Sequence, residues 1–262
     1  MAYTAYDWQQ TLLEKADYAE GRLRHGSPVA ALSCDEGVVL LTVRKSQPKL
    51  YEIYDRLAMG ALGNPSDLET VRQFAVDFSH AEGYQRSAED VSIQRVVGFA
   101  ISPAFKRAFS DPRLMPMVLK AVFAQVGETP EEDALFVLSY DGEFHRRQRV
   151  ACIAGSTQAE ARMTEVFKQG KATQLKEAIR LAVNAWAAGQ WSPPDKETKE
   201  KDQSEAALRL PSASEQEALL KQSLSQGDFV EAALLERNIP RDRRFRTLSP
   251  EETSSFLPNL KP

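Results

Sequence analysis

The sequence has 262 residues, 42% of them hydrophobic and 27% charged, a composition that suits one large domain or one domain with tails. Its 33 basic and 37 acidic residues give a net charge of −4, so no basic excess indicates binding to nucleic acid or to an anionic membrane. No apolar run approaches the length of about 18 residues that a membrane-spanning helix needs. The first residues also lack the basic-then-apolar form of a signal peptide. The two cysteines, Cys34 and Cys152, stand in apolar, strand-like surroundings, so we expect buried, reduced thiols and a cytoplasmic protein.

The first half of the chain predicts a leading helix, four short strands and two long helices. In order, these are a helix at 7–24, strands at 28–32 and 38–43, two strands between Lys49 and Gly63, and helices at 66–84 and 90–107. Apolar residues at helical spacing predict the helices, and short apolar or β-branched runs predict the strands. Ser66, with Glu69 three residues later, has the form of a capping box, so we expect Ser66 to cap the first long helix.

The second half predicts further strand pairs separated by helices. In order, these are a segment at 114–126, strands at 134–140 and 150–154, helices capped by Thr157 and Thr173, strands at 229–235 and 243–247, and a closing helix capped by Ser249. The length of the 114–126 segment permits a helix, but its internal proline and its valines favour an edge strand or a bent strand. The Asp-Gly pair at 141–142 is a strong hairpin signal after the 134–140 strand.

The composition changes between residues 192 and 226, where prolines, charged residues, serine and glutamine replace most large apolar residues. This composition predicts a disordered or loosely helical insertion. We therefore expect a mobile N-terminal segment at 1–8, a single domain at 9–248 that the insertion interrupts, and a C-terminal tail with a short helix at 249–262.

Strands that follow one another through hairpins predict antiparallel sheets, with the helices grouped outside them. The simplest arrangement that buries every apolar stripe is an α+β fold with two stacked sheets between two helical layers. This is a four-layer αββα sandwich with an additional N-terminal helix.

Several short motifs stand in a characteristic order along the chain. They are Asp17-Tyr18-Ala19, Gly26-Ser27, Gly37-Val38-Val39-Leu40, the unit from Lys49 to Gly63, Ser139-Tyr140-Asp141-Gly142-Glu143, Ala154-Gly155-Ser156 and Leu181-Ala182-Val183. In this order they resemble the proteasome family of the N-terminal-nucleophile hydrolase fold, and most of all its α-type subunits of the bacterial kind. The resemblance covers nearly the whole chain outside 192–226.

Active members of that family use a threonine that self-cleavage exposes as the first residue, assisted by a lysine and an acidic residue. In this chain the slot of the nucleophile falls at Ser27, which Pro28 follows, and the acidic slot falls near Val43 and Arg44. Only Lys49 matches, in the lysine slot. The retained leading helix also argues against cleavage at Ser27. The resemblance therefore implies a subunit with no catalytic residues of its own, within a threonine-type endopeptidase complex.

The resemblance also assigns two non-catalytic sites. The lysine that matches Lys49 lines a pocket between neighbouring α-type subunits, where it pairs with the terminal carboxylate of an activator ATPase. Gly26 and Gly63 are expected to leave backbone space there for a docking tail. The segment before the first helix closes the pore in the family, so Tyr3, Tyr6, Asp7 and Trp8 are the gate candidates.

Other kinds of site receive little support. His25, His80 and His145 are scattered, with no cysteine or carboxylate at ligand spacing, so we expect no metal site. No glycine-rich phosphate loop is present, and we expect no cofactor. Basic clusters at 146–149 and 241–246 are predicted to be solvated strands or intersubunit salt-bridge faces.

The resemblance implies an outer-ring subunit of a stacked-ring protease that scaffolds the catalytic β subunits, gates entry and docks a ring-shaped AAA-type ATPase. It implies partners of three kinds: β subunits, further copies of this chain in a ring of seven, and the ATPase. Two alternatives stay open. One is an active hydrolase of the same fold that uses Ser27 after processing, and the other is a ring scaffold unrelated to proteolysis.

Overall fold

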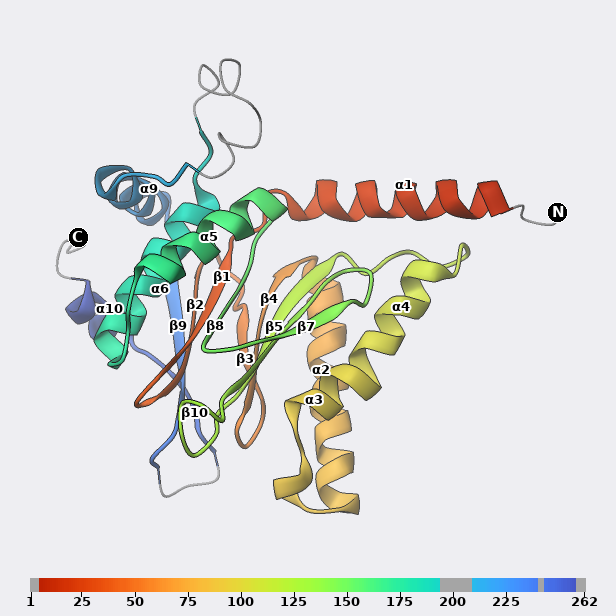
Figure 1. The fold of residues 1–262 in the computed structure, drawn as a ribbon, viewed down its shortest axis with the longest axis horizontal. Coiled ribbons are helices and arrows are strands. Elements are labelled where there is room, and N and C mark those ends of the chain that lie inside the picture. Colours follow the sequence, from red (N-terminus) through yellow and green to blue (C-terminus); the bar gives the residue numbers. More distant parts are fainter. Residues whose placement is uncertain (1–4, 194–208, 240–242, 258–262) are drawn as a thin grey trace.

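A computed structural model describes residues 5–193, 209–239 and 243–257 of the chain (Figure 1). Two antiparallel five-stranded sheets are stacked face to face at its centre. The first sheet has the order β10 (Phe245–Thr247), β9 (Phe229–Glu236), β2 (Gly37–Arg44), β1 (Val29–Cys34) and β8 (Val150–Ile153). The second has the order β3 (Leu50–Tyr54), β4 (Leu57–Gly63), β5 (Leu119–Gln125), β6 (Ala134–Leu138) and β7 (Phe144–Arg147).

Helices cover the outer faces of both sheets (Figure 1). The first sheet carries α5 (Thr157–Gln169), α6 (Leu175–Gln190), α9 (Ala213–Ser225) and α10 (Pro250–Phe256). The second carries α2 (Pro65–Gln85), the 3₁₀ turn η1 (Ala88–Asp90), α3 (Ile93–Arg95), η2 (Val96–Ile101) and α4 (Ser102–Ser110). The predicted αββα sandwich is confirmed.

Strand alternation explains why the sheets are buried on both faces. In β1, Ala30 and Leu32 join the core beneath α5 and α6, whereas Val29 and Ala31 join the core between the sheets. Because successive residues of a strand point to opposite faces, a strand covered on both faces needs a continuous apolar run. β1 and most of β2 have that composition. Both cysteines are free; Cys34 is buried, while Cys152 is partly exposed.

Three predicted helix caps are displaced, two of them towards the N-terminus and one towards the C-terminus. Asn64, not Ser66, caps α2, and its side-chain oxygen accepts a hydrogen bond from the Ser66 amide at 3.0 Å. Ser156 takes the place predicted for Thr157, and Gln174 the place predicted for Thr173. Proline at the first position of α2 has no N–H to satisfy, so the helix begins one residue after the asparagine.

Two predicted segments have a more detailed structure than their patterns indicated. The helix expected at 90–107 is divided into α3, η2 and α4, and η2 is a π-helix. The ambiguous 114–126 segment forms the central strand β5 at 119–125 rather than an edge strand. Pro116 precedes that strand and removes no hydrogen bond from it.

The expected disordered or loosely helical insertion is in part a well-capped helix. In α9 the Ser212 side chain and Glu215 form a reciprocal capping box, and Leu220 is buried in the core that contains α6. Residues 194–208 lie outside the described residues. The predicted division of the chain at 1–8, 9–248 and 249–262 stays a prediction.

Helix α1 (Ala5–Leu23) lies across one end of the sandwich and reaches over α4, with its N-terminus projecting past the body (Figure 1). The Lys15 ammonium is buried and donates to the carbonyl oxygens of Ala108, Phe109 and Asp111 at 2.6–3.1 Å. It thereby supplies donors at the end of α4, where a helix leaves its last carbonyls unsatisfied. Tyr140 also donates to the Glu20 carboxylate at 2.8 Å.

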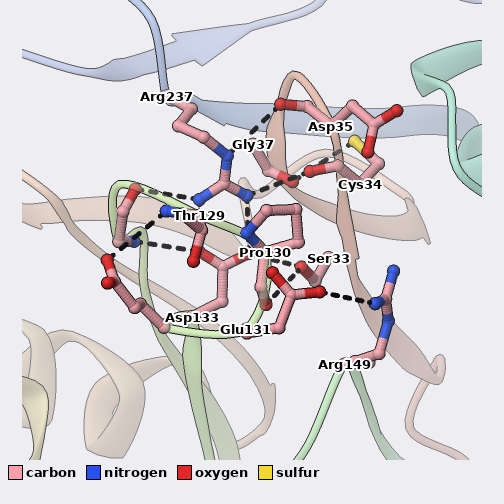
Figure 2. Close-up of polar contacts among 12 residues, drawn as sticks. Ser33, Cys34, Asp35, Gly37, Thr129, Pro130, Glu131, Asp133, Arg149 and Arg237 are labelled. Atoms are coloured by element: carbon pink, nitrogen blue, oxygen red, sulfur yellow. Dashed lines mark hydrogen bonds and ion pairs between the residues drawn. The ribbon is translucent and has the colours of Figure 1, made fainter.

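A buried ion pair joins the two sheets at the opposite end (Figure 2). Arg237 follows β9 and binds both carboxylate oxygens of Asp133 at 2.8 Å, with side-chain exposures of only 3% and 0%. The same guanidinium donates to the carbonyl oxygens of Cys34, Asp35 and Gly127. These five hydrogen bonds match the five N–H donors of an arginine side chain.

Candidate functional site at the Lys49 end of the sheets

The hydroxyl of Ser27 lies just before β1, in the position expected for a nucleophile. Within the described part of the chain it hydrogen-bonds only to the Trp186 indole N–H, at 2.9 Å, and to the Thr42 hydroxyl, at 3.5 Å. A serine needs an adjacent base to become a nucleophile. An indole N–H can only donate, and the Thr42 hydroxyl already donates to the Pro28 carbonyl, so neither group can serve as that base.

The position expected for an acidic residue, near Val43 and Arg44 at the end of β2, is occupied by an apolar and a basic side chain. Val43 is buried in the core beneath α6, and the next residue, Arg44, carries the wrong charge. Neither residue carries a carboxylate, but Glu231 on the neighbouring strand β9 brings its carboxylate to 3.4 Å from the Arg44 Nε. The arrangement does not form the three-part catalytic site of the active members.

Lys49 is half-buried and stands immediately before β3. Its amide N–H donates to the Glu231 carboxylate, at 3.0 Å to Oε2 and 3.3 Å to Oε1, and its carbonyl accepts from the Ala61 amide at 3.0 Å. Within the described residues its ammonium has no carboxylate at ion-pair distance. Hydrogen bonds thus fix the backbone of Lys49 on both sides.

Burial and charge act against each other at this site. Burial lowers the pKa of the Lys49 ammonium, and the negative charges of Glu231 and Asp228 oppose that shift. Burial raises the pKa of Glu231, while the Lys49 and Leu50 amides and the positive charge of Arg44 oppose the change. Both groups are therefore held in surroundings that penalise an unpaired charge.

A solvent-open hollow of about 300 Å³ lies next to this end of β2 and β9. It is lined by Lys45, Ser46, Gln226, Gly227, Asp228 and Phe229. The Arg44 guanidinium lies over the Phe229 ring, with 5.7 Å to the ring centroid, and its Nε is 3.4 Å from the Glu231 carboxylate. The lining combines one cation, Lys45, with one carboxylate, Asp228, and neither Lys49 nor Arg44 belongs to it.

Gly26 and Gly63 lie at the same end, but the fold itself occupies the space of their missing side chains. A Cβ on Gly26 would meet the Leu62 side chain at 2.8 Å. Gly63 has φ +143°, and a Cβ there would stand 2.1 Å from the carbonyl oxygen of Val118 on the adjoining segment. Both residues allow close packing of the backbone, and their part in admitting a docking tail stays a prediction.

The gate candidates lie at the start of α1. Tyr3 lies outside the described residues, while Tyr6 and Asp7 belong to the first turns of the helix. Trp8 is 46% exposed, a high value for so large an apolar side chain. The Thr11 hydroxyl donates to the Asp7 carbonyl, so helical structure reaches this region.

The sequence did not predict the part that two further residues, Glu231 and Lys15, have at this end of the molecule. Glu231 accepts from the Lys49 and Leu50 amides, and Lys15 donates to carbonyls near the end of α4. Glu231 stands in the predicted strand 229–235 among apolar residues, and a lone carboxylate in a buried strand was the available signal. Lys15 is a single lysine in an amphipathic helix, and nothing in its spacing indicated burial.

Within the described ranges no group of three or more His, Cys, Asp or Glu side chains could hold a metal ion. None of the helices found there has the length and apolar composition to cross a membrane.

Comparisons with known proteins agree with this arrangement. Residues 23–192 match the family model described as Proteasome subunit. The chain is 29% identical to the proteasome subunit alpha of Actinosynnema mirum over 257 residues, which cover 97% of this chain and 87% of that protein. It is 28% identical to the protein of the same name from Jonesia denitrificans, over 97% of this chain and 94% of that protein. For the Kineococcus radiotolerans protein of that name, the identity is 31% over 68% of this chain and 74% of the relative.

Proposed function

We propose that this chain, which belongs to the proteasome subunit family and is of its α type, forms the outer ring of a stacked-ring protease. The ring holds seven copies and recruits the catalytic β subunits. It admits unfolded chains through a gate that the residues before and within the start of α1 form. It also docks a ring-shaped AAA-type ATPase through Lys49. Proteolysis takes place on threonine nucleophiles of the β subunits, so the contribution of this chain is control of access.

The observation that carries the docking proposal is the state of Lys49. Both polar groups of its backbone are hydrogen-bonded, and no described carboxylate pairs with its ammonium. A half-buried cation without an ion partner has lost part of its hydration. An ion pair with a carboxylate ligand would offset the free-energy cost of that loss. The adjoining hollow provides room for the end of a peptide chain.

The test of docking is Lys49→Ala in the particle reconstituted with its β subunit. We expect stimulation by the ATPase to fall to the unstimulated rate, because the carboxylate loses its cationic partner, while the ring stays assembled. Peptide hydrolysis with and without ATPase, together with native mass, measures both properties. Lys168→Ala is the matched control, since Lys168 is an exposed lysine on α5 that forms an ion pair with Glu165 on the same helix. Unchanged stimulation of the Lys49 variant, or failure of the wild-type chain to assemble with a β subunit, would contradict the proposal.

The gate proposal is supported by the way α1 is held. Lys15, Ala19 and Leu23 are buried against the body, whereas the described residues from Asp7 to Gln10 are exposed. The anchored half of the helix fixes where the exposed half projects. Bulky side chains such as Trp8 can then obstruct a narrow opening.

Deletion of residues 2–7 tests the gate. Hydrolysis of small peptides by the complete particle should rise severalfold, because the segment before Trp8 is removed and the obstruction is shortened while the Lys15 anchor is kept. The point substitution Gln9→Ala, which changes one exposed side chain and leaves the segment in place, is the matched control. An unchanged rate in the deletion variant would count against a gate.

Exposed apolar side chains on the α2–α4 layer support contact with other subunits. Phe74, Tyr84 and Phe99 on the helices, and Leu114 and Met115 on the loop before β5, are all substantially exposed, with Tyr84 at 94%. Large exposed apolar groups gathered on one layer are typical of interaction surfaces. We therefore assign this layer to contact with the β ring.

A further inference from the structure

Glu231 lies on β9 beside Lys49, although 182 positions separate the two residues in the chain. It is paired with Thr42 across the first sheet, and its side chain is only 8% exposed. A carboxylate buried to this degree is costly unless hydrogen bonds satisfy it. The groups that donate hydrogen bonds to the Glu231 carboxylate therefore indicate what this side chain does.

Those partners are mostly backbone groups of one short segment. The carboxylate accepts from the Lys49 amide, at 3.0 and 3.3 Å, and from the Leu50 amide at 3.3 Å. Arg44 contributes its positive charge at 3.4 Å. A side chain of the first sheet thus binds the residues at which the second sheet begins.

The opposite side of Lys49 is held by the second sheet. Its carbonyl oxygen accepts from the Ala61 amide on β4 at 3.0 Å. The preceding residue, Pro48, is held as well, because its carbonyl accepts from the Tyr51 hydroxyl at 2.6 Å. Lys49 is therefore clamped between the sheets, and only its four-carbon side chain is free to move.

We propose that Glu231 is the positioning residue of the Lys49 site: it fixes the Lys49 backbone between the two sheets and leaves the ammonium for a carboxylate ligand. This inference rests on the proposed docking function. The arrangement replaces the acid that the slot at Val43 lacks, but with a different use, since the carboxylate binds the amide of Lys49 and not its ammonium. Holding the Lys49 backbone in place before binding lowers the conformational entropy that the site must lose when a tail docks.

Two substitutions of Glu231 separate its charge from its hydrogen bonds. Glu231→Gln keeps one carbonyl acceptor for the amides, whereas Glu231→Leu keeps none. The matched control is Glu52→Gln on β3, where the partly exposed carboxylate forms an ion pair with the exposed Arg243. Circular dichroism and native mass establish that each variant is folded and assembled.

The first readout is stimulation of peptide hydrolysis by the purified ring ATPase, titrated against each assembled particle. For Glu231→Leu we expect the half-saturating ATPase concentration to rise about tenfold, as a lost hydrogen bond to a charged group predicts, with maximal stimulation unchanged. Glu231→Gln should give a smaller rise, because the amide oxygen still accepts. The Glu52 control should match the wild type.

The second readout needs no ATPase. Trace acetylation with acetic anhydride, quantified by peptide mass spectrometry, reports the reactivity of Lys49 relative to Lys168. Loss of the nearby negative charge should increase the acetylation of Lys49 about three- to tenfold in both Glu231 variants, because more of the amine is neutral.

The outcomes distinguish this inference from the docking function on which it rests. If Lys49→Ala abolishes stimulation while both Glu231 variants keep wild-type half-saturation and wild-type Lys49 reactivity, Glu231 has no positioning role and docking stands. If Lys49→Ala has no effect, docking falls. In that case, unchanged acetylation in the Glu231 variants would overturn the positioning role as well.

Discussion

The two ends of the sandwich each bury a carboxylate, but they treat it differently. At one end Asp133 receives a bidentate arginine, the Gly127 amide and the Ser33 hydroxyl, and Arg237 uses its remaining donors on carbonyl groups (Figure 2). At the other end Glu231 binds two amides and a more distant Arg44, and the neighbouring Lys49 ammonium has no partner among the described residues.

The difference separates a structural ion pair from a site that can bind. A buried pair whose donors and acceptors are all satisfied has nothing left to offer a ligand, and it only holds the two sheets together. At the other end, the Lys49 ammonium has no ion partner among the described residues, and the hollow nearby is open to solvent. Substitutions of the ion pair at the closed end should therefore change stability, whereas those of Lys49 and Glu231 at the open end should change function.

The largest effect is expected at the closed end. Arg237→Ala leaves Asp133 buried without its partner, so the free energy of unfolding should fall by about 3–5 kcal/mol. Urea unfolding of the isolated chain measures this change. The control is Arg149→Ala, which removes an exposed ion pair with Glu131 and should cost no more than about 1 kcal/mol. If the free energy of unfolding falls by the same small amount in both variants, the buried ion pair does not contribute strongly to holding the sheets together.

An intermediate effect is expected where α1 joins the body at the open end. Lys15→Met removes the donor from three carbonyl oxygens near the end of α4, so the free energy of unfolding should fall by about 1–3 kcal/mol. Amide hydrogen exchange should become faster in α1 and near the end of α4. If Lys15→Met and a control at exposed Arg22, Arg22→Met, behave alike, the anchoring role of Lys15 is wrong.

The smallest effect is expected at the unused nucleophile slot. Ser27→Ala removes the hydroxyl that accepts from the Trp186 N–H and should cost about 0.5–1.5 kcal/mol. The isolated protein should cleave no peptide in either form, because Ser27 has no base in the wild type and is absent from the variant. Intact mass should also show that residues 1–26 are retained. A peptidase activity that accompanies loss of those residues would overturn the non-catalytic reading.

Local patterns predicted most elements because each depends on neighbouring residues. The short apolar run of β1 and the turn at 141–142 needed no distant partner to be recognised. The caps were displaced because several polar residues near each helix start can cap it. The residue that caps is the one directly before the first helical residue, and the backbone conformation decides where that is. For α2 the asparagine before the proline takes that position.

Helix α9 shows where local composition was insufficient. Its few apolar residues predicted little order, yet Leu220 finds a buried position in the core with α6. An isolated helix of this length is marginal in water, so packing on an existing surface provides the stabilisation. The Ser212–Glu215 capping box was a signal present in the sequence that the composition obscured.

The sequence by itself determined the strand and helix order, the sandwich, the absence of an acid at Val43 and the presence of Lys49, because these follow from local pattern and residue identity. Only the tertiary structure decided which buried charges are paired. Glu231 meets Lys49, and Asp133 meets Arg237, across long stretches of chain and between different sheets. Hydrogen bonds of this kind depend on how the two sheets stack. The periodicity of the sequence does not show which residues of different sheets the stacking brings together.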